Sequence, residues 1–349
     1  MKKIVSVIGT RPEVIKIAAL SPILKKHFKH ITIHTGQHYD YKMSGTFFDE
    51  LSIDKPDYNL NVGSGTHSQQ TAKILQKMEK ILIKENPALV IVYGDTNSTL
   101  GGALAASKLN IPVAHFESGM RNFDNQMPEE INRKIVDHIS SIYFCCSKKA
   151  VANLKKEGIV KNVYFSGDIH YDIFLQRKPN ISILNKLNIH PKKFYFATIH
   201  RQENTNVLEK LRKILKTLEK VDNLVVLALH PRTKKAVLKL KENFPNIKII
   251  DPVNFEETIG LQISAKAIIT DSGGIQKESY WLKVPCFTLR NSTEWIETVE
   301  TRWNFLVGDN LSSLPLILKH INTPQNHPNF YGDGNSATKI TKILVEYLR

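Results

Sequence analysis

Acidic side chains that follow strand-like runs are the first residues in this chain that could do chemistry. Leu89–Tyr93 and Ile111–Phe116 are short, apolar and rich in β-branched residues, which predicts two buried strands. Asp95 lies two residues beyond the first run, and Glu117 directly follows the second. A helical stretch, Thr99–Leu109, separates the runs, so the predicted unit is βαβ with parallel strands. We therefore expect both carboxylates on one rim of the sheet, where α/β proteins place ligand chemistry.

More charged groups come next in the chain. Glu129 and Glu130 open a helix after Pro128, and Arg133 lies one turn further on. Several carboxylates facing one crevice indicate proton transfer or, alternatively, a metal site. No histidine–carboxylate spacing in the sequence is typical of a metal ligand set, so the pattern favours proton transfer without a metal.

The N-terminal segment pairs a strand with a cationic turn. Ile4–Ile8 predicts a strand that leads into Gly9-Thr10-Arg11-Pro12-Glu13 and a helix. Helix capping accounts for Thr10, Pro12 and Glu13, because threonine followed by glutamate three residues later has capping-box spacing. Arg11 and Lys16 are not explained in this way. Cations at a strand-to-helix turn would suit a phosphate.

The second half of the chain carries a glycine-rich turn of the same kind. The strand-like run Ala267–Thr270 is followed by Asp271-Ser272-Gly273-Gly274, which must open a helix. Glycines at a helix start let the backbone approach an anion and direct free N–H groups toward it. Ser272 is a natural helix cap, and the carboxylate of Glu278, inside the helix, could accept both hydroxyls of a ribose. A capped helix with a glycine turn is the alternative interpretation.

Another polar cluster follows the predicted strand Phe194–Ile199. It begins His200-Arg201-Gln202-Glu203-Asn204. A histidine at a strand end is often only a hydrogen-bonded part of the structure, so taken alone His200 carries little functional weight.

Strands and helices alternate along the whole chain, which predicts an α/β protein with two Rossmann-like, doubly wound domains. We place the first at residues 1–170, joined by a C-terminal helix at 337–349, and the second at 171–336. The polar stretch Arg177–Lys193 is interpreted as the crossing between them. Two such halves facing across a cleft resemble the glycosyltransferase-B architecture, in which the second half mainly holds a nucleotide.

Composition bounds the function. With 349 residues, 42% of them hydrophobic, the chain can build two cores, and no run approaches the roughly 18 apolar residues of a membrane span. We expect a cytoplasmic protein with no membrane partner. Its three cysteines, Cys145, Cys146 and Cys286, have no metal spacing and are expected to be buried thiols. The formal net charge of +15 falls largely on lysines of predicted helix surfaces and forms no aromatic-interleaved stripe, so nucleic acid is not an expected partner.

The motifs together resemble one family, the non-hydrolysing UDP-N-acetylglucosamine 2-epimerases, along essentially the whole chain. The matching stretches are GTRPEVIK, TGQH, YGDTNSTL, HFESGMR, MPEEINR, HRQEN, DSGGIQKE and YGDGNSATKI. The resemblance implies reversible conversion of UDP-N-acetylglucosamine to UDP-N-acetylmannosamine by elimination and re-addition of UDP through a 2-acetamidoglucal. It implies no cofactor, UDP as the departing group, and a homodimer.

The resemblance also implies roles for individual residues. The catalytic candidates that match by motif position are Asp95, Glu117, Glu129 and His200. The substrate-binding candidates are Arg11, Lys16, Arg133, Ser272, Gly273, Gly274, Glu278 and, less directly, Arg290. Family members regulated by a second substrate molecule use the Gln-His region, which makes Gln37, His38 and Arg201 the regulatory candidates.

The sequence departs from the family where it commonly reads TERPE. Here the residues are Thr293-Glu294-Trp295-Ile296-Glu297, so an arginine is lost. Other interpretations stay open. A hydrolysing relative would release N-acetylmannosamine and UDP, a glycosyltransferase of the same fold would need an acceptor site, and a nucleotide-sugar-binding protein would not need so many carboxylates.

Overall fold

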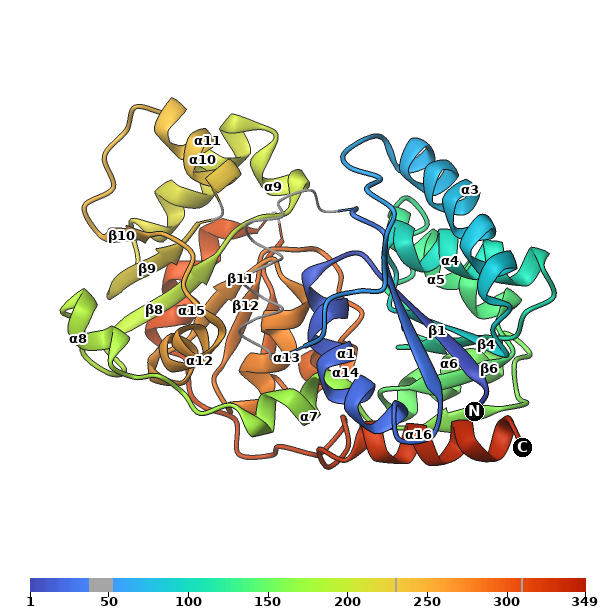
Figure 1. The fold of residues 1–349 in the computed structure, drawn as a ribbon. Helices are drawn as coiled ribbons and strands as arrows, with labels where there is room; N and C mark the ends of the chain where they lie inside the picture. Colours follow the sequence, from blue (N-terminus) through green and yellow to red (C-terminus); the bar gives the residue numbers. More distant parts are fainter. Residues whose placement is uncertain (38–52, 230, 309) are drawn as a thin grey trace. The chain divides into compact units, whose positions relative to one another are not determined.

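The structure of the protein is a computed structural model, which describes residues 1–37, 53–229, 231–308 and 310–349. Two compact units make up the chain (Figure 1). Unit 1 contains Met1–Gln176 and Asn329–Arg349, and unit 2 contains Arg177–Pro328. Residues 171–176 and 329–336 were expected in the second domain, but they belong to unit 1, where α7 (Ile169–Gln176) packs against the N-terminal and C-terminal helices.

Unit 1 is a parallel sheet with the strand order β3-β2-β1-β4-β5-β6-β7. Its strands are β1 (Lys3–Ile8), β2 (Lys29–His34), β3 (Tyr58–Asn59), β4 (Leu89–Tyr93), β5 (Val113–Phe116), β6 (Ile142–Cys145) and β7 (Val163–Phe165). Its other helices are α1 (Arg11–Leu24), α3 (His67–Glu85), α4 (Asn97–Lys108), α5 (Pro128–Ile139), α6 (Lys148–Lys156) and α16 (Ser336–Tyr347). The order reverses direction at β1, as in a doubly wound fold.

Unit 2 is also built around a parallel sheet, with the strand order β10-β9-β8-β11-β12-β13. The strands are β8 (Phe194–Thr198), β9 (Leu224–Ala228), β10 (Ile247–Ile250), β11 (Ile268–Thr270), β12 (Cys286–Thr288) and β13 (Asn304–Leu306). The helices are α8 (Ile183–Leu187), α9 (Gln202–Thr205), α10 (Leu208–Leu218), α11 (Pro231–Lys239), α12 (Phe255–Ser264), α13 (Gly273–Trp281), α14 (Ile296–Glu300) and α15 (Leu314–Lys319), the last preceded by a 3₁₀ turn (Leu311–Ser313). All pairings among these strands are parallel, so the expected fold class is confirmed.

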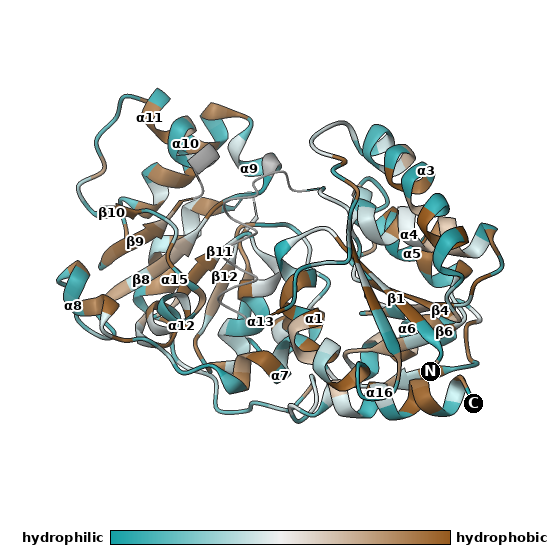
Figure 2. Cartoon of the chain, in the orientation of Figure 1, coloured by the Kyte–Doolittle hydropathy of each residue, from teal (hydrophilic) through white to brown (hydrophobic). Residues whose placement is uncertain are grey.

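Each sheet is buried by helices whose apolar faces meet it. In unit 1 one core joins β1, β2 and β4 to the inner faces of α3 and α4. In unit 2 the largest described core joins β8 and β9 to α10 and α15. Figure 2 shows hydrophobic strands in both sheets and, on α3 and α10, hydrophobic and polar residues on different faces. The three cysteines are free thiols and buried, as expected.

The interpretation of Arg177–Lys193 as a polar crossing was wrong in part. The segment contains α8, and Ile183, Leu184 and Ile189 are buried in a core with β8. The polar residues of the segment lie on the outer face of a short amphipathic helix. The overall polar composition of the stretch did not indicate this helix. None of the helices in the described ranges has the length and apolar character needed to cross a bilayer.

Candidate active site

The rim of unit 1 brings Asp95 and Glu117 together as the parallel register predicts. Tyr93 at the end of β4 lies opposite Phe116 at the end of β5, so the turns after these two strands are neighbours. Each turn contains one residue in the left-handed backbone conformation. Gly94 has φ +67° and Glu117 has φ +65°. Glycine adopts this conformation readily, whereas for glutamate it costs about 1 kcal/mol, a strain typical of functional sites.

Lys16 contacts Glu117. The ammonium of Lys16, on the second turn of α1, lies 2.5 Å from Oε2 of Glu117, and its side chain is only 5% exposed. A Cβ atom on Gly94 would lie 3.1 Å from the same carboxylate oxygen. The small residue at 94 therefore leaves room for the pair, and α1 supplies the cation that holds the Glu117 carboxylate.

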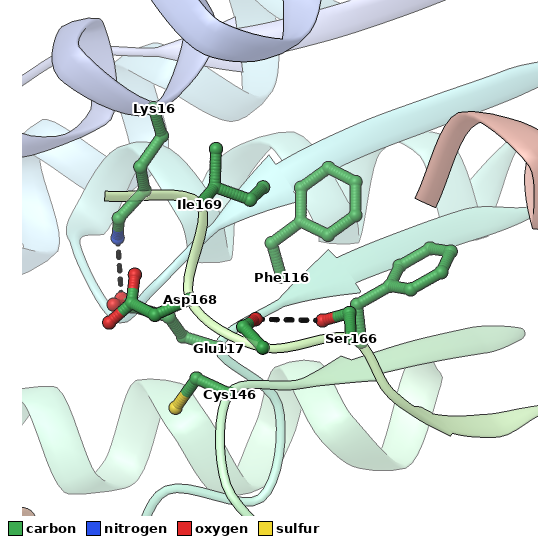
Figure 3. A pocket seen from close by; sticks show the side chains of 9 residues that line it. Lys16, Phe116, Glu117, Cys146, Ser166, Asp168 and Ile169 are labelled. Atoms are coloured by element: carbon green, nitrogen blue, oxygen red, sulfur yellow. Dashed lines mark hydrogen bonds and ion pairs between the residues drawn. The ribbon is translucent and has the colours of Figure 1, made fainter. Parts of the chain in front are cut away.

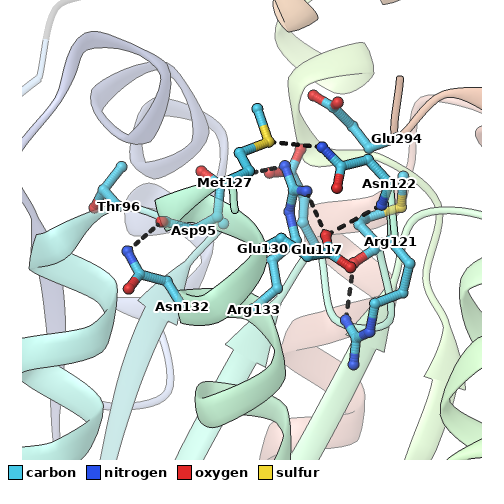
Figure 4. Close-up of polar contacts among 12 residues, drawn as sticks. Asp95, Thr96, Glu117, Arg121, Asn122, Met127, Glu130, Asn132, Arg133 and Glu294 are labelled. Atoms are coloured by element: carbon cyan, nitrogen blue, oxygen red, sulfur yellow. Dashed lines mark hydrogen bonds and ion pairs between the residues drawn. The ribbon is translucent and has the colours of Figure 1, made fainter. Parts of the chain in front are cut away.

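Helix α5 holds Asp95. The guanidinium of Arg133 forms an ion pair with the Asp95 carboxylate (Figure 4). The side-chain amide of Asn132 donates to the main-chain carbonyl of Asp95 at 2.8 Å. Arg133 and Asn132 are both buried, while the Asp95 side chain is 28% exposed. Asp95 thus reaches the surface of unit 1 with both its main chain and its carboxylate fixed.

The two adjacent acids of α5 have different environments. Glu130 is fully buried, receives the backbone N–H groups of Asn122 and Phe123, and pairs with Arg133 at 3.0 Å (Figure 4). It is a structural acid that anchors the loop before α5. Glu129 is half-buried in the first turn, and no hydrogen bond or ion pair joins it to another described residue. Of the pair, only Glu129 has a carboxylate available for chemistry.

Glu13 ties two of the strand-end turns together. Its carboxylate accepts the backbone N–H groups of Gly9 at 2.6 Å and Thr10 at 2.8 Å, and the hydroxyls of Thr96 at 2.7 Å and Thr99 at 3.3 Å. Burial outweighs these bonds and raises the pKa of Glu13. The sequence predicted a helix-capping role, but the structure adds a link from the α1 turn to the start of α4.

A buried polar network lies behind the β4 and β5 turns. The ring of His115 lies between the Asp137 carboxylate and the main-chain carbonyl of Gly94, at 2.7 Å from each. Asp137 also accepts from Arg121 at 2.7 Å and from the N–H of Gly119 at 3.0 Å. Burial opposes ionisation, but His115 and Arg121 together lower the pKa of Asp137.

A small pocket opens beside Glu117 at the ends of β5, β6 and β7 (Figure 3). Lys16, Glu117 and Asp168 give it a polar side, and Phe116, Phe144 and Ile169 give it an apolar side. The main chain and side chain of Asp168 are themselves engaged, since its N–H donates to Tyr331 O and its carboxylate accepts from His170 N. The pocket places mixed polar and apolar surface next to a candidate catalytic acid.

Unit 2 has a histidine–carboxylate pair at the ends of β8 and β11. Nδ1 of His200 lies 2.9 Å from the fully buried Asp271, which also accepts from the N–H of Arg201 and the amide of Asn204. Burial alone would raise the pKa of Asp271, but the hydrogen bond and charge of His200 and the other donors outweigh it and lower the pKa. Since the Asp271 carboxylate can only accept, Nδ1 of His200 is the donor in this contact. The His200 side chain is 50% exposed.

The glycine turn at the start of α13 is formed as predicted. Ser272 is the N-cap and accepts from Ile275 N at 3.5 Å. A Cβ atom on Gly273 would come within 2.8 Å of the Glu294 carboxylate, so a larger residue there would displace that side chain. At Gly274 only the Ser272 hydroxyl lies near, at 3.8 Å, so the backbone is open. The N–H groups of this helix start can approach an anion.

Two charged side chains lie in the same part of unit 2. Arg290 is 4% exposed and donates to Glu294 at 3.0 Å, while its other terminal nitrogen is buried with no hydrogen-bond partner in the described chain. Glu278 is 5% exposed and accepts from Gln262 at 2.6 Å. Arg290 lies within the buried part of unit 2 and is not a surface cation.

The structure describes two of the three regulatory candidates, Gln37 and Arg201. The side-chain oxygen of Gln37 accepts the N–H of Ser98 at 3.0 Å and its hydroxyl at 2.7 Å, so Gln37 holds the start of α4. Arg201 donates to the main-chain carbonyl of Asp271 at 3.0 Å. His38 lies outside the described residues. Arg11 is exposed on the first turn of α1.

Sequence reasoning missed the residues that support the candidates. His115, Asp137 and Asp271 received no role, although each lies at a strand end or within the helix after one. A buried acid or histidine next to a candidate motif was the available signal. Within the described ranges, no group of three or more histidine, cysteine, aspartate or glutamate side chains could hold a metal ion.

Comparison with known proteins identifies the family. The family model described as UDP-N-acetylglucosamine 2-epimerase matches residues 23–345. A Methanococcus maripaludis protein described as a UDP-N-acetylglucosamine 2-epimerase homolog is 49% identical, covering 98% of this chain and 99% of its own. A Pseudomonas aeruginosa UDP-2,3-diacetamido-2,3-dideoxy-D-glucuronate 2-epimerase is 40% identical over 99% of both chains.

Solved structures agree with this result. The Methanocaldococcus jannaschii UDP-GlcNAc 2-epimerase, crystallised with UDP-GlcNAc and UDP, has a TM-score of 0.91 and 43% identity over 99% of both chains. A calicheamicin glycosyltransferase, CalG4, is 11% identical with a TM-score of 0.55, covering 99% of this chain and 94% of its own, which shows the shared glycosyltransferase-B type of fold alone. This chain belongs to the UDP-N-acetylglucosamine 2-epimerase family.

Proposed function

We propose that the protein converts UDP-N-acetylglucosamine and UDP-N-acetylmannosamine into one another without hydrolysis. The observation that carries the proposal is the rim of unit 1, where Asp95 and Glu117 follow adjacent strands and each is held by its own buried cation. A related epimerase was crystallised with UDP-GlcNAc and UDP, which supports this substrate class. The proposal needs neither nicotinamide nor a metal ion.

The chemistry explains why such a site needs both acids and cations. A C2–H bond with no neighbouring carbonyl is a weak acid, so proton removal must accompany breakage of the bond between C1 and the diphosphate oxygen. The C2–H electron pair becomes the second bond of a C1=C2 double bond, and the C1–O pair leaves with UDP. Re-addition of the UDP oxygen at C1, with proton delivery to the other face of C2, yields the epimer. No water is consumed.

Proton transfer on two faces of C2 requires at least two acid–base groups. Asp95, Glu117 and Glu129 are our candidates in unit 1. Lys16 keeps the Glu117 carboxylate in place and adds positive charge beside it. We propose that Arg133 likewise keeps the Asp95 carboxylate in place and adds positive charge beside it.

In unit 2 we assign the groups that bind UDP and stabilise its departure. Ser272, Gly273 and Gly274 present helix N–H groups for the diphosphate. Positive charge comes from Arg290, one of whose buried nitrogens has no hydrogen-bond partner among the described residues. Glu278 is the candidate for the ribose hydroxyls. His200 can donate or accept a proton through Nε2, with Asp271 stabilising its charged form. Arg11 is assigned to the diphosphate. Regulation through Gln37, His38 and Arg201, a homodimer and a cytoplasmic location remain predictions.

Product analysis by phosphorus NMR separates this proposal from its hydrolysing alternative. The purified protein is incubated with either UDP-sugar epimer and no added cofactor. We expect a stable mixture of both epimers with the diphosphate ester intact. Accumulation of UDP with free N-acetylmannosamine would assign the protein to the hydrolysing class. No reaction from either epimer would contradict both, leaving transfer to an acceptor or nucleotide-sugar binding as the function.

Substitution of Glu117 tests whether the activity depends on the rim of unit 1. Glu117→Gln keeps the size and removes the carboxylate charge, so kcat is expected to fall by about 100-fold or more, as for loss of a general acid or base. The matched control is Glu209→Gln, an exposed glutamate in the first turn of α10, which is expected to leave kcat unchanged. Equal activity of the two variants would remove Glu117 from the mechanism.

A further inference from the structure

The buried ring of His115 contacts the candidate site without reaching its surface. His115 is the third residue of β5 and has no exposed surface. Nδ1 lies 2.7 Å from Oδ1 of Asp137, and Nε2 lies 2.7 Å from the main-chain oxygen of Gly94. Both distances are those of strong hydrogen bonds.

These contacts fix the protonation of the ring. A main-chain carbonyl can only accept, so Nε2 must carry a proton to approach it at 2.7 Å. Asp137 is ionised, because one of its oxygens forms a buried ion pair with Arg121 at 2.7 Å and also accepts the N–H of Gly119 at 3.0 Å. Nδ1 must therefore donate as well. The ring carries a proton on each nitrogen and a positive charge.

The charge is balanced inside unit 1. Arg121 bridges Asp137 and Glu157, donating to Glu157 at 2.8 and 2.6 Å. His115 and Arg121 are thus two cations matched by two carboxylates. The other titratable groups near Asp137 are Tyr143 and Cys145 of β6, and burial together with the Asp137 charge raises the pKa of each. Both are therefore neutral, and His115 is the cation that balances Asp137 beside Arg121.

The hydrogen bond from His115 to Gly94 bears directly on Asp95, the next residue in the chain. The peptide between Gly94 and Asp95 is held through the Gly94 oxygen by His115, and the peptide after it is held through the Asp95 oxygen by Asn132 at 2.8 Å. Arg133 pairs with the Asp95 carboxylate. Both peptides that flank Asp95 are therefore fixed from behind, which leaves its side chain little freedom to leave the rim.

We propose that His115 is a positioning residue for Asp95, acting as a doubly protonated imidazolium that joins Asp137 to the Gly94–Asp95 peptide. It touches no substrate and moves no proton in the reaction. The proposal rests on the proposed function for its effect on turnover. Its protonation state is a property of the free protein and can be tested apart from any activity.

The first test is nitrogen NMR of the full-length protein labelled at histidine, without substrate. The chain has 13 histidines, and the His115 ring is assigned as the signal set that disappears in His115→Gln. At neutral pH we expect both ring nitrogens of His115 to carry a proton. A spectrum with one protonated and one bare nitrogen would overturn the proposal, whether or not the protein proves to be an epimerase.

The second test measures kcat and KM separately. A glutamine side chain at 115 has one amide donor group in place of two ring N–H groups, so it cannot hold both Asp137 and Gly94 O. We expect kcat of His115→Gln to fall about 10- to 100-fold with KM nearly unchanged, since misplacement of a catalytic group acts on turnover. His138→Gln is the control, because His138 is exposed on α5 and its one hydrogen bond to the described part of the chain is to Lys134 O. An unchanged kcat in His115→Gln would overturn the proposal.

Asp137→Asn separates positioning from general destabilisation. An amide at 137 can donate to Nδ1 of a neutral His115, whose remaining proton stays on Nε2 and is donated to the Gly94 carbonyl. We expect this variant to show one bare ring nitrogen and to keep several-fold more kcat than His115→Gln. A purely structural role predicts the reverse, since Asp137→Asn disturbs more contacts. Equal losses of kcat that track the loss of folded protein would likewise contradict a positioning role.

Discussion

At the scale of single residues, the structure gives the candidate acids distinct surroundings. Lys16 was expected near a diphosphate or a sugar, and in the structure its ammonium contacts Glu117. Glu129 and Glu130 look equivalent in sequence, yet Glu130 is fully buried and accepts from backbone N–H groups, whereas Glu129 is only half-buried. Such differences depend on which way each side chain of α5 points. Under the proposed function, they determine which carboxylate can exchange a proton with the sugar.

Asp271 stabilises unit 2 in a pH-dependent way. Its folded pKa is lowered, so its stabilising contribution is present above the unfolded pKa of about 3.9 and is lost as the pH falls through the folded value. Asp271→Asn is expected to lower the free energy of unfolding by about 2 to 3 kcal/mol near neutral pH, because a buried charged acceptor of several donors is lost. The difference from wild type should shrink below about pH 4.

Urea unfolding followed by tryptophan fluorescence measures this directly. All three tryptophans, Trp281, Trp295 and Trp303, lie in unit 2, so the signal reports on that unit. The control is Asp251→Asn, an exposed partner of Lys234 whose loss should cost no more than about 1 kcal/mol. A difference for Asp271→Asn that is small at neutral pH, or grows on acidification, would contradict the assigned charge.

At the scale of elements, the strand-end turns and α5 act together. The strand order puts the turns after β1, β4 and β5 next to one another. Glu13 links the first two turns, and α5 supplies side chains to the last two. The positive φ angles at Gly94 and Glu117 shape the rim that results.

Gly94→Ala tests this arrangement. A methyl group at 94 meets left-handed backbone, φ +67°, and the Glu117 carboxylate at 3.1 Å. We expect a stability loss of about 1 to 2 kcal/mol and a fall in kcat of about 10-fold or more, because Glu117 must move. Gly158→Ala is the matched control, since Gly158 has φ +82° and open space around it. It should lose similar stability and keep its kcat, and equal kcat values would show that Glu117 tolerates the shift.

Much of this could be predicted from the sequence, for identifiable reasons. Buried parallel strands such as Leu89–Tyr93 are short apolar runs, so their positions and the shared rim of Asp95 and Glu117 could be inferred from local pattern. The glycine turn before α13 could be inferred from its residue types. The supporting contacts could not be predicted. His115 with Gly94, and Asp271 with His200, join residues far apart in sequence through side-chain directions that only packing determines.

At the scale of the whole molecule, the chain returns to unit 1 after completing unit 2. Helix α16 packs on α1 and α7, and Asp172 of α7 accepts the N–H groups of Ser336 at 3.0 Å and Ala337 at 2.7 Å. The start of the last helix is thus capped by a side chain from a helix more than a whole domain earlier. Residues 329–349 are therefore part of unit 1, whereas the sequence predicted this only for residues 337–349.

Asp172→Ala is expected to loosen unit 1 and spare unit 2. Loss of a cap costs about 1 to 2 kcal/mol, so backbone hydrogen exchange should accelerate in peptides from α16, α1 and α7. The tryptophan unfolding midpoint, which reports unit 2, should not move. Asp172→Asn keeps one acceptor oxygen and should show a smaller effect. Faster exchange in unit 2 peptides instead would contradict the assignment of α16.

The most direct measurement of the central claim is proton NMR of UDP-N-acetylglucosamine incubated with the protein in D₂O. We expect UDP-N-acetylmannosamine to appear and the C2 proton signals of both epimers to fade, because C2 exchanges with solvent while the diphosphate ester stays intact. Epimerisation with the C2 proton retained would contradict proton transfer by the rim carboxylates. An unchanged spectrum from both epimers would contradict the proposed function itself.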